Sequence, residues 1–153
     1  MAAATANRDG ERQTGILLSY SGASGYKYYK GTLLIKAGAS GARVIPLTGA
    51  GSSNGTFLGV VENQVDLTAG LGASQAIIDV WAQGEFTFNA NGTGVSADIG
   101  KIAYGIDDQT VGVSAVVPSI AVGLITGMPS TTEYRVLINS FIGSRGVSSF
   151  PNN

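Results

Sequence analysis

Any chemistry in this chain must come from carboxylates, hydroxyls and amines, because its 153 residues include no histidine and no cysteine. These two absences exclude Ser-His-Asp and Cys-His catalysis, Cys/His zinc sites, iron–sulfur clusters, haem bound through His or Cys, and disulfides. The acidic side chains are therefore the first candidates for a catalytic or metal site.

Two acidic groupings have a spacing that could serve chemistry. Asp107 and Asp108 could form a metal or acid–base pair, but adjacent residues on a strand point to opposite faces, so a hairpin turn is the preferred interpretation. Glu62 and Asp66 could share one loop, yet no third ligand follows at a spacing that suits calcium. We therefore predict no catalytic residue, no metal site, no cofactor and no enzymatic activity.

Two further motifs are predicted to be turns. Gly51–Gly55 has the form G-x-S-x-G, but a nucleophile elbow needs a histidine base, which the chain lacks. The sequences Asn54-Gly-Thr56 and Asn91-Gly-Thr93 match the glycosylation acceptor. Because no apolar secretory signal begins the sequence, we interpret them as Asn-Gly turns.

The segment Tyr26–Lys30 interleaves aromatic and cationic side chains, which could stack bases and hold phosphates. Two charges are few for that purpose, and the net charge of −1 supplies no positive field to attract nucleic acid. We instead predict a strand edge or protein interface, with Tyr26, Tyr28 and Tyr29 as contact residues. Trp81 is predicted to be a core or interface aromatic.

The two ends of the chain differ from its middle in composition. Residues 1–14 form a polar, charge-balanced arm, in which Arg8 and Arg12 are expected to pair with acidic groups of a partner. Residues 143–153 form a small, polar tail, in which Phe150 is expected to anchor in a groove of another copy of the chain or of a partner protein. A passive tail is the alternative.

Residues 15–142 contain short β-rich runs separated by clusters of Gly, Ser, Asn and Thr. Glycine contributes 23 residues, and charged residues make up only 12%, about half the usual ~25%. We predict one all-β domain, a small glycine-rich barrel or sandwich with extended arms and at most one short helical turn, capped by Ser96. The predicted strands are Ile16–Tyr20, Tyr28–Lys36, Arg43–Leu47, Thr56–Glu62, Ala76–Ala82, Glu85–Asn89, Lys101–Ile106, Thr110–Val113, Ala121–Thr126 and Glu133–Phe141.

The last predicted strand alternates most clearly. Tyr134, Val136 and Ile138 share one face, and the other face carries Leu137 among polar residues.

The stretch from Gln109 to Thr132 carries no charge and exceeds the ~20 residues that a membrane helix needs. Its apolar members are mostly β-branched, and prolines and glycines interrupt it. We therefore predict two buried strands broken at Pro118-Ser119, and no membrane span.

Seven short motifs follow one another along most of the chain: Tyr29–Leu34, Ile45–Gly49, Gly55–Glu62, Ile78–Gly84, Ser96–Tyr104, Val122–Ile125 and Tyr134–Ile138. In this order they resemble the small decoration, or cement, proteins of tailed-bacteriophage capsids, a family long catalogued as a domain of unknown function among phage structural genes. No motif is catalytic, and the order carries the resemblance. Ile99, within the fifth motif, is expected to be buried.

The resemblance implies a virion protein that binds the outer surface of the assembled shell and bridges neighbouring major capsid protein subunits. Its implied partners are the major capsid protein and further copies of the chain, as a homotrimer or alternatively a dimer, with no direct nucleic-acid or membrane partner. Two other classes stay open. One is another virion component, such as a head-fibre base or tail protein; the other is a non-viral β-domain that binds carbohydrate or protein.

Overall fold

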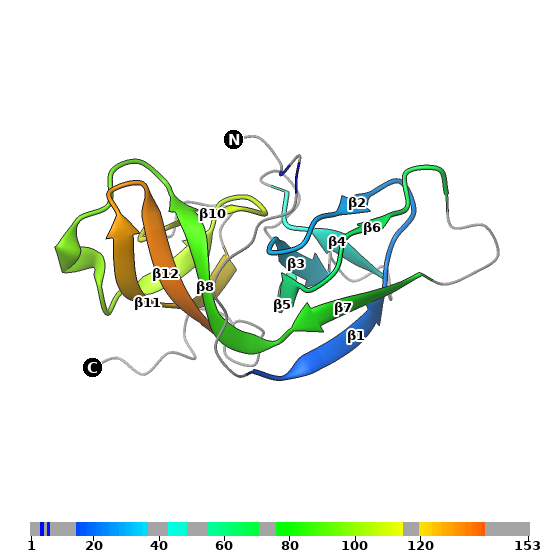
Figure 1. The fold of residues 1–153 in the computed structure, drawn as a ribbon, viewed down its shortest axis with the longest axis horizontal. Coiled ribbons are helices and arrows are strands. Elements are labelled where there is room, and N and C mark those ends of the chain that lie inside the picture. Colours follow the sequence, from blue (N-terminus) through cyan, green and yellow to red (C-terminus); the bar gives the residue numbers. More distant parts are fainter. Residues whose placement is uncertain are drawn as a thin grey trace.

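The described part of the chain folds almost entirely as β-structure, with 58% of its residues in strands and 3% helical. The computed structural model describes residues 4, 6, 15–36, 43–48, 55–70, 76–114 and 120–139. Two strand assemblies lie next to each other along the longest axis of the molecule (Figure 1). The predicted all-β class with a small barrel is confirmed.

The first assembly is a five-stranded antiparallel sheet in the order β1-β7-β5-β3-β4. The two edges of this sheet meet at one point, where Gly22, directly after β1, forms an isolated bridge with Val44 of β4. A two-stranded ribbon, β2-β6, packs on the same half. The bounds are β1 Leu17–Ser21, β2 Lys27–Tyr28, β3 Leu33–Lys36, β4 Val44–Pro46, β5 Thr56–Val61, β6 Val65–Asp66 and β7 Ile77–Trp81.

The second assembly is a closed barrel of five strands in the order β10-β8-β12-β11-β9. All its pairs are antiparallel except β8 with β10, which is parallel. A single 3-10 turn, η1, precedes β9. The bounds are β8 Gln83–Ala90, η1 Ser96–Asp98, β9 Ile102–Gly105, β10 Thr110–Gly112, β11 Ile120–Ser130 and β12 Glu133–Asn139.

The sheet and the barrel are joined by one almost unbroken length of strand, because only Ala82 separates β7 from β8 (Figure 1). Ala82 is fully buried, and its N–H donates to the carbonyl oxygen of Ile16 at 2.7 Å. The junction is therefore held from the β1 side as well as by chain connectivity.

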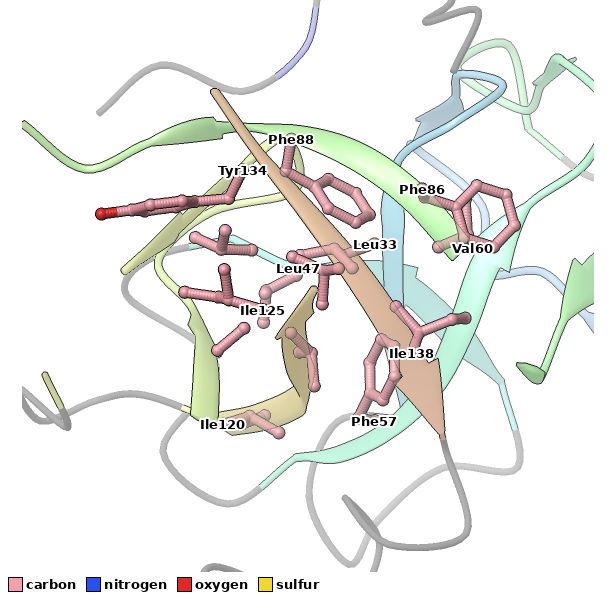
Figure 2. Close-up of a cluster of buried hydrophobic side chains, with 14 of the residues drawn as sticks. Leu33, Leu47, Phe57, Val60, Phe86, Phe88, Ile120, Ile125, Tyr134 and Ile138 are labelled. Atoms are coloured by element: carbon pink, nitrogen blue, oxygen red, sulfur yellow. The ribbon is translucent and has the colours of Figure 1, made fainter. Parts of the chain in front are cut away.

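Two apolar clusters stabilise the molecule. The shared core combines inward side chains of the barrel with one face of the sheet, and Figure 2 shows the two sets interleaved. The ribbon core lies on the opposite face, against β2-β6. The shared core contains Leu33, Ile35, Leu47, Phe57 and Val60 from the sheet half, and Phe86, Phe88, Ala103, Val111, Ile120, Val122, Ile125, Tyr134, Val136 and Ile138 from the barrel. The ribbon core contains Tyr28, Leu34, Val44, Val61, Leu67, Ile78 and Val80.

Most predicted strands are confirmed within one or two residues, and two are corrected. The run Tyr28–Lys36 is two strands, β2 and β3, which belong to different sheets. β11 continues past its predicted end at Thr126 and includes Pro129, because the pairing with β12 is irregular there and does not need every N–H. The short ribbon strand β6 was not predicted.

The predicted Asn-Gly turn at residues 91–92 is also confirmed. Asn91-Gly92 follows β8, with Gly92 at φ +91°, the left-handed conformation that glycine favours. The predicted helical turn exists, but Val95, and not Ser96, occupies the position before its first residue. Asn54 and the break at Pro118-Ser119 lie outside the described residues.

Candidate interaction surfaces

Side chains of the aromatic segment Tyr26–Lys30 pack against one another and against the ribbon. Tyr26 packs against the ribbon core, and its ring centroid lies 6.5 Å from that of Tyr28. The ammonium of Lys27 lies 5.2 Å from the ring centroid of Tyr29 and 3.7 Å from a carboxylate oxygen of Asp66. Tyr26 and Tyr29, both half-buried, remain candidates for contact with a partner.

Tyr28 requires a correction, because its side chain is fully buried in the ribbon core and cannot form an outer interface in this fold. Its hydroxyl accepts the N–H of Ala23 at 2.8 Å and lies at donating distance from two carbonyl oxygens, Val44 at 2.8 Å and Ala23 at 3.0 Å. Burial raises the pKa of this phenol to about 12. The side chain thus fills the point where the two sheet edges meet.

Trp81 is confirmed as a core-associated aromatic. Its ring is half-buried against the shared core, and its indole N–H donates to the carboxylate of Glu62. Gly59 lies beside it at φ +142°, and a Cβ on Gly59 would come within 2.1 Å of the Trp81 carbonyl oxygen. Only glycine allows β5 to approach β7 this closely.

The outer wall of the barrel carries a continuous apolar row that we call the barrel-wall row, Ile102, Leu124 and Leu137. Leu124 of β11 is in register with Leu137 of β12 on one side and with Ile102 of β9 on the other. Leu124 is 37% exposed and Leu137 46%. Beyond Leu137 the row meets Glu85 of β8, which forms an ion pair with Arg135 at 3.4 Å. This is an apolar strip with a polar rim.

A second group of exposed apolar side chains lies on β1 and β7 and is interrupted. Leu17 is 47% exposed and Ile77 is 53% exposed, but they lie at opposite ends of the paired strands. Between them the pair Ser19 and Asp79 is joined by a hydrogen bond of 2.6 Å. Sequence reasoning identified neither exposed group, although an apolar Leu137 among polar neighbours on one strand face was a usable signal.

The carboxylate of Asp98 in the η1 turn is held by three donors. It accepts the Tyr134 hydroxyl at 2.6 Å, the Lys101 ammonium at 2.9 Å and the Val95 N–H at 3.1 Å. The hydrogen bond from Tyr134, followed by that from Lys101, lowers the pKa of Asp98 to about 2. The expectation for Ile99 is wrong: Ile99 is 49% exposed, and the buried residue of the η1 turn is Asp98.

The Asp107-Asp108 pair lies in the hairpin turn between β9 and β10, as predicted, but both side chains are buried. Oδ1 of Asp107 accepts the N–H of Gln109 at 3.0 Å, and Oδ1 of Asp108 accepts the N–H of Ala4 at 2.9 Å. In the part of the chain that the structure describes, no three acidic side chains gather in a way that could hold a metal ion.

Several predicted contact residues lie outside the described residues. These are Arg8 and Arg12 of the arm, and Phe150 with the rest of the tail. Residues 51–54 of the G-x-S-x-G motif lie outside as well.

No protein-family model and no curated protein matches this chain. None of the helical segments in the described ranges has the length and apolar character needed to cross a membrane.

Proposed function

We propose that this chain decorates the outer surface of a tailed-bacteriophage capsid, where it bridges neighbouring major capsid protein subunits and stabilises the head. The order of the seven motifs carries this proposal. Those motifs contribute to β3, β4, β5, β7, β9, β11 and β12, which supply residues of both apolar cores. The resemblance thus involves the framework of the fold and is not limited to its surface turns.

The proposed mechanism is thermodynamic linkage and requires no chemical step. A protein that binds only the assembled lattice stabilises that lattice by its binding free energy. Many copies on one shell act together, so a modest affinity at each seam suffices. A chain with only 12% charged residues suits this role, because a weakly charged surface is readily covered by partners.

Copies of the chain are proposed to associate through the barrel-wall row, as a homotrimer or alternatively a dimer. The row is contiguous across β9, β11 and β12, whereas hydrogen-bonded polar residues divide the exposed group on β1 and β7. Contact with the capsid protein would then use other parts of the surface, among them Arg8 and Arg12 of the arm and Phe150 of the tail.

The test is co-sedimentation of the full-length chain with empty shells assembled from the major capsid protein of the same genome. We expect binding that saturates at a fixed number of copies per expanded shell. Unexpanded shells of the same protein serve as the matched control and should bind less. Failure to bind either shell would contradict the proposal, and immunolabelling confined to virion tails would favour the other virion component.

A further inference from the structure

The β9–β10 turn contains two carboxylates that are unusually well buried for a hairpin turn. Asp107 is 3% exposed and Asp108 is 2% exposed. Oδ1 of Asp107 is satisfied by the N–H of Gln109, but its Oδ2 is buried without a hydrogen-bond partner. A buried carboxylate oxygen without a hydrogen-bond donor lowers the stability of the fold. Such an atom therefore indicates a site where a further donor can bind.

One donor from the amino-terminal arm already lies on this turn. Ala4 is only 7% exposed, and its N–H donates to Oδ1 of Asp108 at 2.9 Å, a buried contact across 104 positions of sequence. This contact is independent of the unsatisfied oxygen on Asp107, and both lie in the same turn.

The turn is a fixed platform and not a loose loop. The carbonyl oxygen of Asp108 accepts the N–H of Leu33 at 2.7 Å, which ties the turn to β3 of the sheet. On the barrel side, the N–H of Ile106 donates to the carbonyl oxygen of Thr110 at 2.9 Å and closes the hairpin. The two carboxylates therefore have defined positions before any segment reaches them.

We propose that this turn is a docking site for the amino-terminal segment of the chain. Asp108 binds the N–H of Ala4, and Oδ2 of Asp107 is the second acceptor, for a peptide N–H or hydroxyl of the same segment. The sequence around Ala4, Met1-Ala-Ala-Ala-Thr5, suits this use, because small side chains let a backbone N–H approach a buried acceptor closely. The inference does not depend on the proposed function. Any partner that binds the arm must compete with the turn for it.

The test is amide hydrogen exchange of Ala4, measured by NMR on the full-length, isotope-labelled protein. We expect the Ala4 amide of the wild type to exchange at least about tenfold more slowly than in an unstructured peptide. Asp108→Ala should abolish that protection, and Asp107→Ala should reduce it. Asp108→Asn, which keeps an acceptor oxygen, should retain part of it. Asp79→Ala is the matched control, because it removes a hydrogen-bonded carboxylate on β7, and it should leave Ala4 protected.

Two outcomes overturn the site and one overturns its second acceptor. An Ala4 amide in the wild type that exchanges at the unstructured rate would show that the arm does not dock, and this result needs no variant to fold. Protection that persists in a folded Asp108→Ala variant would remove Asp108 from the site. Unchanged protection in Asp107→Ala would show that Oδ2 receives no donor from the arm.

Discussion

The two halves of this molecule close in different ways. In the barrel, backbone pairing runs all the way round through five strands, so closure needs no side chain. In the described part of the sheet, the edges meet at the bridge between Gly22 and Val44, beside a hydrogen bond of 3.1 Å from the Ala23 N–H to the Val44 carbonyl oxygen. The hydroxyl of Tyr28 lies at that point with hydrogen bonds to both sides. The barrel is closed by its strand pairing, whereas the two sheet edges are joined by a short contact that the Tyr28 hydroxyl reinforces.

Tyr134 is the barrel's counterpart of Tyr28 and has a different task. Its ring belongs to the shared core, while its hydroxyl points away from the cluster (Figure 2) and donates to Asp98. That bond holds the η1 turn against the barrel and plays no part in closing it. The two buried tyrosines thus differ in role: Tyr28 hydrogen-bonds the backbone where the strand pairing of the sheet stops, and Tyr134 fixes a turn beside a barrel that strand pairing already closes.

The largest expected effect concerns the shared core, which makes the two halves one cooperative unit. Phe57, on the sheet, is fully buried among barrel side chains. Phe57→Ala should lower the free energy of unfolding by about 3–5 kcal/mol, because it leaves a cavity between the halves. Urea titration followed by Trp81 fluorescence and by far-UV circular dichroism should show one coincident transition.

Phe57→Leu is the matched control, since it keeps most of the buried volume and should cost less. Two separate transitions in the wild type would contradict the idea of a core common to both halves.

The next effect tests the difference in closure directly. Tyr28→Phe keeps the ring but removes the hydroxyl that bonds the Ala23 N–H and the carbonyl oxygens of Ala23 and Val44, and it should cost about 1–3 kcal/mol. The bond from the Ala23 N–H to the Val44 carbonyl oxygen remains. Tyr134→Phe should cost less, because Asp98 retains Lys101 and the Val95 N–H as donors. Equal losses in urea titrations of the two variants would mean that the seam does not depend on Tyr28.

Much of the fold was predictable from the sequence, because strand propensity and turn residues are local properties. Which strands pair with one another was not predictable. Tyr28 and Leu33 lie in one predicted strand, Tyr28–Lys36, yet Tyr28 joins the ribbon core and Leu33 the shared core. Which face of a sheet is covered depends on contacts between residues far apart in sequence.

The candidate surfaces were harder to predict for the same reason. Asp107 and Asp108 were identified as a turn, but their burial depends on the docking of Ala4 and the approach of β3, which spacing does not encode. The alternation of its strand placed Leu137 on the polar face, but only the register across β11 and β12 shows that Leu124 lies beside it on the same outer face.

The free energy of unfolding should depend on pH at both extremes. The loss at low pH should come from Asp98 in the barrel half, and the loss at high pH from a tyrosine in each half. Burial, with the hydrogen bond to Asp98 second, raises the pKa of Tyr134 to about 12, and burial raises that of Tyr28 to about 12, from 10.0. Both contributions are present below pH 10 and are lost as the pH rises through 12. The pKa of Asp98 is lowered from 3.8 to about 2, so its contribution is present above pH 4 and is lost as the pH falls to about 2.

Urea midpoints measured from pH 2 to pH 12 check this assignment. Tyr28→Phe should weaken only the alkaline loss. Tyr134→Phe should weaken both losses, because it removes the phenol and also the donor with the largest effect on Asp98. An acid limb that is unchanged in Tyr134→Phe would contradict the role given to that hydrogen bond.

Substitutions in the barrel-wall row should have the smallest effect on the free energy of unfolding. They should have the largest effect on the association of copies. Leu137→Ser and Leu124→Ser change side chains that are already partly in water, so each should alter the free energy of unfolding by only about 0.5 kcal/mol. If copies associate through the row, each substitution removes apolar area from the interface. Burial of a leucine is worth about 1.5–3 kcal/mol, so self-association should weaken about tenfold or more.

Sedimentation velocity over a range of protein concentrations measures that change. Ile77→Ser is the matched control, because Ile77 is at least as exposed, at 53%, but belongs to the interrupted group on the sheet half. It should leave the association unchanged, which would place the contact between copies on the barrel and leave the sheet half for other partners. Equal losses of self-association in Ile77→Ser and Leu137→Ser would contradict the assignment of the contact to the barrel. A loss in Ile77→Ser alone would assign the contact to the sheet half.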